Sequence, residues 1–102
     1  MNALVEQKLP EIRALCEKYH VERLYLFGSA TGDDFTDKSD LDFLYSHKKG
    51  IPVLKRGEFF FELHYALEAL FDRDIDLLSE QSLSNPYFIA SVEKSKQLLY
   101  AA

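Results

Sequence analysis

Cysteine is nearly absent from the sequence, since Cys16 is the only one among 102 residues. A single cysteine excludes an internal disulfide and a zinc site built from cysteines. Long apolar runs are missing as well, and none approaches the roughly 20 residues that a membrane-spanning helix needs. Residues 1–10 lack the basic and apolar blocks of a secretory signal. We therefore expect a cytoplasmic protein that does not bind membranes.

Basic residues are also few. The chain has 12 lysines and arginines against 17 aspartates and glutamates, which gives a net charge of −5. Nonspecific nucleic-acid binding depends on basic side chains that neutralise phosphates, so direct binding of nucleic acid is not expected. A basic protein partner suits an acidic chain better. Hydrophobic residues make up 47% and no low-complexity tract occurs, so residues 1–102 are predicted to form a single globular domain.

Apolar periodicity predicts the order helix, strand, loop, strand, helix, strand, helix. The predicted elements are a helix that ends near His20, strand 24–27, loop 30–39, strand 41–45, helix 53–71, strand 73–78 and a helix from Pro86 to the chain end. Asn85 is the expected N-cap of that last helix, and Phe88, Val92 and Leu99 are expected on its apolar side. Three strands and three helices predict an α/β (α+β) layer arrangement, with a small sheet packed against helices.

The chemistry-bearing residues lie in the middle of the chain. Gly28 and Ser29 directly follow the first apolar strand, and Asp40 and Asp42 flank Leu41 ten residues later. Alternation along a strand puts Asp40 and Asp42 on the same face. Two carboxylates on one face repel each other unless a cation lies between them, and Mg²⁺ accepts one or two carboxylates together with phosphate oxygens. The Gly-Ser turn lets a phosphate approach the backbone closely.

A third acidic segment follows helix 53–71. Ile75 and Leu77 share one face of the predicted strand, and Asp74 and Asp76 share the other. Spacing alone does not choose between the two aspartates. Acidic residues beside an apolar one are also common on half-exposed strands, and Gly-Ser is a common turn. It is the occurrence of both features at strand ends that favours a metal and phosphate site.

Together these segments resemble a known family. Phe-Gly-Ser at 27–29, Asp-Leu-Asp-Phe-Leu at 40–44 and Ile-Asp-Leu-Leu at 75–78 resemble the polymerase-β-like nucleotidyltransferase superfamily, and the short length resembles its minimal, MNT-type members. The resemblance implies a mixed sheet flanked by helices that binds Mg²⁺ and a nucleoside triphosphate. Its expected site residues are Gly28 and Ser29 for the triphosphate and Asp40, Asp42 and Asp76 as metal ligands. Asp76 is also expected to activate the incoming hydroxyl group.

The resemblance further implies an antitoxin that transfers AMP from ATP to a tyrosine of a HEPN-type toxin, either as a homo-oligomer or as a hetero-oligomer with the toxin. One feature departs from the family pattern, because Ala30-Thr31-Gly32 stands where many members carry an arginine. The candidates to replace that charge are Lys38, Lys48, Lys49 or a residue of the partner protein. The departure leaves open a non-catalytic antitoxin that neutralises its partner by occlusion. A plain interaction domain, which would bind no Mg²⁺–ATP, is the third hypothesis.

Overall fold

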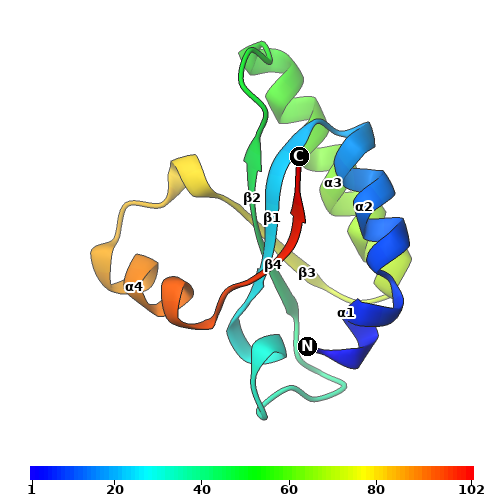
Figure 1. Cartoon of the computed structure of the whole chain (residues 1–102), viewed down its shortest axis with the longest axis vertical. Coiled ribbons are helices and arrows are strands. Elements are labelled where there is room, and N and C mark those ends of the chain that lie inside the picture. Colours follow the sequence, from blue (N-terminus) through cyan, green and yellow to red (C-terminus); the bar gives the residue numbers. More distant parts are fainter.

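A four-stranded mixed sheet forms the centre of the molecule in the computed structural model, which describes all 102 residues (Figure 1). The strands are β1 (Val21–Phe27), β2 (Leu41–His47), β3 (Ile75–Ser79) and β4 (Gln97–Ala101), in the spatial order β3-β2-β1-β4. Strand β2 pairs parallel with β3, whereas β1 pairs antiparallel with both β2 and β4. The predicted mixed sheet flanked by helices is thereby confirmed.

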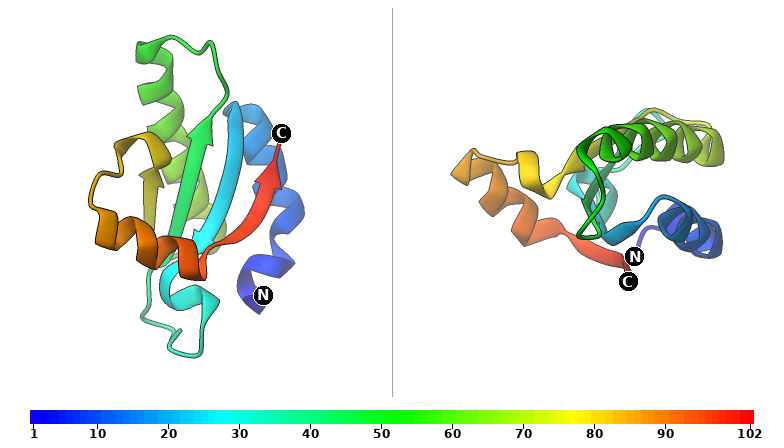
Figure 2. Two further views of the ribbon diagram at one scale, coloured as in Figure 1. Left: turned by 60° about the vertical axis from the view of Figure 1, so that its left-hand side comes forward. Right: turned by 90° about the horizontal axis from the view of Figure 1, so that it is seen from above.

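Three helices cover one face of this sheet, namely α1 (Ala3–Gln7), α2 (Leu9–Lys18) and α3 (Val53–Phe71). Figure 2 shows α2 and α3 together on one side of the strands and α4 (Pro86–Ser95) on the other. The main core lies under α2 and α3, where 17 buried residues pack together. Leu24, Leu41 and Phe43 enter it from the strands, and Leu63 and Leu67 enter it from α3, all almost fully buried. Each such side chain contributes roughly 1.5–3 kcal/mol when it is buried.

Cys16 belongs to this core and has no exposed surface. Burial is the main reason that the pKa of its thiol rises to about 12, with the neighbouring Glu17 charge adding to the effect. The thiol therefore stays protonated at neutral pH and unreactive. Cys16 thus serves as a small hydrophobic residue of the core.

The opposite face carries only α4, which begins as the sequence indicates. The Asn85 side chain accepts hydrogen bonds from the backbone amides of Tyr87 (2.9 Å) and Phe88 (3.3 Å), and Pro86 occupies the first turn. Val92 then packs against Phe27 and Leu44 in a second, smaller cluster. Because α4 covers only part of this face, the remainder of it stays open.

The prediction that the last helix continues to the chain end is wrong. Helix α4 ends at Ser95, and residues 97–101 form β4 on the free edge of β1. Spacing of three and four residues from Val92 to Leu99 fits a helix, but Leu98 and Leu99 also fit the alternation of a strand. Leu98 is 51% exposed and Leu99 only 4%, as a two-sided edge strand requires. The sheet therefore has four strands rather than three.

Several boundaries also differ from the prediction. Strand β1 begins at Val21 instead of residue 24, and β2 ends at His47 instead of residue 45. The residues before Pro10 form the short helix α1, which the Asn2 side chain caps by accepting from the amides of Leu4 and Val5. Strand β3 begins at Ile75 instead of residue 73. No helix of the structure combines the length and the apolar character that crossing a membrane demands.

Candidate active site

Two aspartates from neighbouring strands form the centre of the candidate site. The parallel register of β2 and β3 puts Asp42 directly beside Asp76. Strand alternation turns Leu41 and Phe43 into the main core, and it turns the two aspartates to the α4 face. Asp74, the alternative that spacing left open, precedes β3 and lies outside the strand. Topology thus brings together two carboxylates that are 34 positions apart in the sequence.

The electrostatics of this pair are unfavourable in the absence of a cation. The pKa of the Asp42 carboxyl is raised to about 6, first by burial, then by the adjacent Asp76 carboxyl within hydrogen-bonding range, and last by the charge of Asp40. None of the four ion pairs of the structure involves these three aspartates. We call Asp42 and Asp76 the acid pair. It holds negative charge that no basic side chain of the chain neutralises.

Asp40 makes the smallest contribution to the electrostatics of the acid pair. It is the last residue before β2 and is exposed to solvent. No group of three or more Asp, Glu, His or Cys side chains is arranged in the structure as a ready set of metal ligands. A metal site formed by Asp40, Asp42 and Asp76 together therefore stays a prediction, and the structure itself brings only Asp42 and Asp76 into contact.

Gly28 lies against the acid pair at the end of β1. Its φ of +74° falls in the left-handed region, which glycine adopts without steric cost. A Cβ atom at this position would overlap Oδ2 of Asp42 and would lie 3.3 Å from its Cγ. Only glycine leaves room for the carboxylate beside the turn, so Gly28 and Asp42 form one structural unit.

The turn after β1 is the 3₁₀ helix η1 (Gly28–Thr31), and hydrogen bonds from distant segments hold it in place. The amide of Gly28 donates to Oγ of Ser95 at the end of α4 (3.2 Å), and Asn2 donates to the carbonyl of Ala30 (3.3 Å). The Gly28 amide is therefore already engaged, so this residue contributes space rather than a free donor. Ser29, the other predicted phosphate-binding residue, lies half-buried in the same turn.

An arginine that the sequence did not single out fastens the loop between η1 and β2. Arg73 donates to the backbone carbonyls of Thr36 (3.2 Å) and Ser39 (3.1 Å), and its guanidinium lies 4.7 Å from the centre of the Phe35 ring. These contacts hold the segment that leads into Asp40. The residues that Arg73 contacts are more than 30 positions away in the sequence, so no local pattern predicts these contacts.

The lysines considered as replacements for the missing arginine are not at the acid pair. Lys48 and Lys49 follow the far end of β2, and six residues of extended strand between Asp42 and Lys48 span about 20 Å. Lys38 is exposed in the loop before the strand. The basic residues on the α4 face are instead Arg23 and Lys96, and the sequence pattern singled out neither of them.

The sequence of this chain matches a known protein family. The family model for "Polymerase beta, Nucleotidyltransferase" matches residues 10–102. The chain belongs to the polymerase-β nucleotidyltransferase family. Two proteins of Methanocaldococcus jannaschii, both named as candidate protein adenylyltransferases, are 34% and 35% identical to it over 82 residues, which is 80% of each chain compared.

Solved structures share the fold of this nucleotidyltransferase. A structure described as a candidate minimal nucleotidyltransferase superposes with a TM-score of 0.67 at 24% identity and covers 91% of this chain and 90% of its own. A toxin–antitoxin structure with AMP-PNP reaches a TM-score of 0.71 at 22% identity, covering 92% of this chain and 73% of that one. The Shewanella oneidensis complex of a tri-AMPylated HEPN toxin with its MNT antitoxin reaches 0.61 at 22%, covering 95% and 72%.

The residues of the acid pair suit a divalent cation. Carboxylate oxygens are the hard ligands that Mg²⁺ prefers, and it commonly takes one or two of them together with phosphate oxygens. The pKa of Asp42 is raised by burial first and by the neighbouring carboxyls of Asp76 and Asp40 second. The space at Gly28 leaves the Asp42 carboxylate accessible beside the turn. Both observations fit a bound cation with a phosphate group next to it.

Proposed function

We propose that this chain is a Mg²⁺-dependent nucleotidyltransferase that moves AMP from ATP to a hydroxyl group of a partner protein, as the antitoxin of a HEPN-type toxin. The observation that carries the proposal is the acid pair beside Gly28, unpaired by any basic residue, in a member of this family. The relatives named as protein adenylyltransferases and the AMPylated toxin of a structural neighbour support the choice of AMP and of a protein acceptor.

In the proposed reaction the acceptor oxygen attacks the α-phosphorus of ATP. The new bond is a phosphodiester between that oxygen and AMP, and the bond from the α-phosphorus to pyrophosphate breaks. Asp42 and Asp40 would hold Mg²⁺ on the phosphates, and Asp76 would accept the proton of the acceptor hydroxyl while also contacting the cation. When bound, Mg²⁺ offsets the negative charge that develops on the phosphate oxygens.

Geometry rather than covalent chemistry would supply most of the rate. Gly28 and Ser29 would position the triphosphate, and the acid pair would orient the reacting oxygens in line with the leaving group. The hydrogen bond from Gly28 to Ser95 keeps the turn at a fixed place relative to α4. A rigid turn reduces the entropy that is lost when the triphosphate binds.

The test is an incubation with ATP and Mg²⁺, with and without the product of the neighbouring gene, followed by intact mass measurement. We expect the partner to gain one or more AMP units. Asp42→Asn and Asp76→Asn should abolish the gain, whereas Asp74→Asn, an exposed carboxylate next to β3, should retain it. Asp76→Asn should still bind more nucleotide than Asp42→Asn. Full transfer by Asp42→Asn would contradict the proposed site.

A second function is favoured by one specific observation. The segment after Ser29 provides no cation for a triphosphate, since it continues as Ala30-Thr31-Gly32 and then two exposed aspartates. A chain that keeps the fold but binds its toxin by occlusion would need no such cation. A tight complex with the partner, with no mass gain at any Mg²⁺ or ATP concentration, would establish this alternative.

A further inference from the structure

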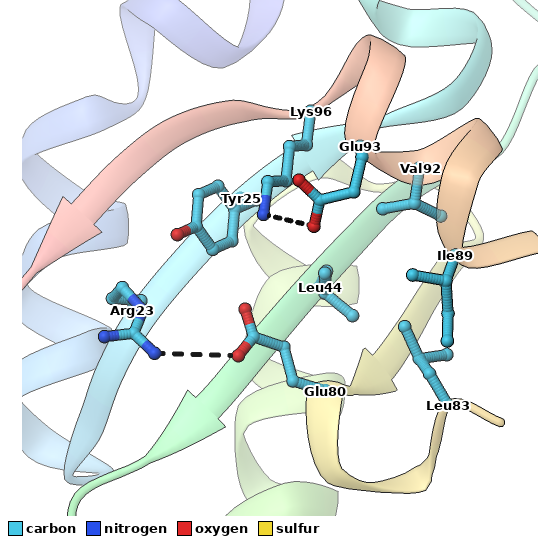
Figure 3. A pocket seen from close by; sticks show the side chains of 9 residues that line it. All are labelled: Arg23, Tyr25, Leu44, Glu80, Leu83, Ile89, Val92, Glu93 and Lys96. Carbon is cyan, nitrogen blue, oxygen red and sulfur yellow. Dashed lines mark hydrogen bonds and ion pairs between the residues drawn. The ribbon is translucent and has the colours of Figure 1, made fainter. Parts of the chain in front are cut away.

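A pocket of about 460 Å³ lies between the sheet and α4, on the same face as the acid pair (Figure 3). Its floor is apolar and includes Leu44 of β2 and Val92 of α4, both almost fully buried. Ile89 and Leu83 close one side, and the ring of Tyr25 lies on the other. The volume falls within the roughly 300–1,000 Å³ of typical small-molecule sites.

Two ion pairs form the polar rim of this sheet–α4 pocket. Nη2 of Arg23 lies 3.7 Å from Oε2 of Glu80, and Nζ of Lys96 lies 2.7 Å from Oε1 of Glu93. The Lys96 ammonium also lies 4.5 Å from the centre of the Tyr25 ring. Both basic groups of the pocket thus have an acidic partner already. The pocket as a whole carries no excess charge, although the carboxylates keep capacity to accept further hydrogen bonds.

This composition selects the kind of ligand. A triphosphate would meet Glu80 and Glu93 as like charges, so its anionic part does not suit the pocket. A flat, neutral group with apolar faces and hydrogen-bonding edges fits better, because its faces contact Leu44, Ile89 and the Tyr25 ring while its donors reach the rim. A purine nucleoside has these properties, since its amino and hydroxyl groups can donate to the carboxylates.

The position of the pocket relative to the acid pair also suits a nucleoside. Asp42 and Leu44 are alternate residues on one face of β2, about 7 Å apart along the strand. The turn at Gly28 is linked to the end of the pocket at Lys96, because Ser95, which accepts a hydrogen bond from the Gly28 amide, directly precedes Lys96. A ligand whose phosphates lie at Gly28 and Asp42 can therefore extend its nucleoside over Leu44.

We propose that the sheet–α4 pocket binds the nucleoside part of the substrate triphosphate, while the acid pair and the Gly28-Ser29 turn hold its phosphates. The inference rests on the proposed function, because it assumes a nucleoside triphosphate as substrate. It adds a binding surface formed by β1, β2, η2 (Glu80–Ser82) and α4 that lies outside the motif residues.

The test compares the affinities for ATP and for inorganic tripolyphosphate, both measured by calorimetry with Mg²⁺ on the full chain. The wild-type protein should bind ATP at least about tenfold more tightly, since only ATP carries a nucleoside to bury. Ile89→Trp fills the pocket and should bring the ATP affinity to within about threefold of the tripolyphosphate affinity, which itself stays unchanged. Tyr87→Trp is the matched control, because Tyr87 is on the same helix but 86% exposed.

Leu83→Trp fills the pocket from a loop instead of a helix, and it replaces the first variant if Ile89→Trp does not fold. Normal ATP affinity in the folded blocking variant would overturn the inference. If that variant instead lost only the modification of the partner, the pocket would belong to the acceptor side chain. Equal wild-type affinities for ATP and tripolyphosphate would overturn the inference alone, whereas binding of neither would overturn the proposed function as well.

Discussion

Replacing Gly28 by alanine tests whether this glycine serves the site or only the backbone. The substitution has two separate consequences. It strains the backbone, because residue 28 has a φ of +74°, and it displaces the Asp42 side chain, because the new Cβ would overlap Oδ2 of Asp42. A left-handed backbone costs a residue with a side chain roughly 1–2 kcal/mol. Removing the overlap requires the Asp42 side chain to rotate, which costs about 1 kcal/mol more. The Asp42 carboxylate then no longer faces Asp76.

Two other glycines separate these consequences. Gly50 has a φ of +86° but nothing within 4 Å of its would-be Cβ, so Gly50→Ala carries the backbone cost alone. Gly32 has an extended backbone and equally open surroundings, so Gly32→Ala carries neither cost. We expect losses of unfolding free energy of about 2–3 kcal/mol for Gly28→Ala, about 1–2 kcal/mol for Gly50→Ala and less than about 0.5 kcal/mol for Gly32→Ala.

Among the three glycine variants, the affinity for Mg²⁺–ATP should differ far more than the free energy of unfolding. Urea denaturation gives the free energies of unfolding, and calorimetry at a temperature where all three variants are folded gives the affinity for Mg²⁺–ATP. Gly28→Ala should lose ATP binding by at least about tenfold, whereas Gly50→Ala and Gly32→Ala should bind as the wild type does. Wild-type affinity in a folded Gly28→Ala variant would refute the reasoning, because it would mean that the Asp42 carboxylate can move without consequence.

Three further predictions concern charge, topology and the α4 contact. Folding raises the pKa of Asp42 from 3.8 to about 6, so the folded state binds this proton more tightly than the unfolded state does. The free energy of unfolding should therefore fall as the pH rises through this range. Solvent screening at a half-buried site limits the effect to about 1 kcal/mol. Asp42→Asn should remove that portion of the pH dependence in Mg²⁺-free urea titrations, and an unchanged profile would count against it. Leu99→Ala should cost about 2–5 kcal/mol and Leu98→Ala less than about 1 kcal/mol by denaturation, and equal losses would argue against β4. Ser95→Ala should weaken ATP binding severalfold by releasing the turn, while Ser91→Ala, exposed on the same helix, should leave the calorimetric affinity unchanged.

Local patterns predict the strands of the site well, and long-range pairing explains what they miss. The alternation around Leu41 and Phe43 predicts which face Asp42 occupies, because a strand has a strict two-residue period. That Asp76, rather than Asp74, meets Asp42 depends on the parallel register of β2 and β3, which no spacing encodes. The resemblance to the family, and not the pattern, selected Asp76.

The C-terminal segment shows a different kind of failure. Residues at positions 88, 92, 95 and 99 satisfy helical spacing, and the strand 97–101 is too short to oppose that pattern within the sequence. What decides the structure is the free edge of β1, where backbone groups need partners. The same turn into β4 brings Ser95 to Gly28 and Lys96 to Tyr25, so the contacts overlooked at the site follow from the boundary that was misplaced.

The two faces of the sheet therefore differ in what they contribute. The face under α2 and α3 buries 17 residues, whereas the α4 face buries a cluster of three and leaves an uncompensated acid pair beside it. Like charges held close together cost stability, and the large core supplies enough to tolerate that cost. Helix α4 adds little to the core but borders the pocket and binds the Gly28 turn. Substitutions on its inner side should accordingly affect nucleotide binding more than folding, which is the reverse of what the inner side of α3 should show.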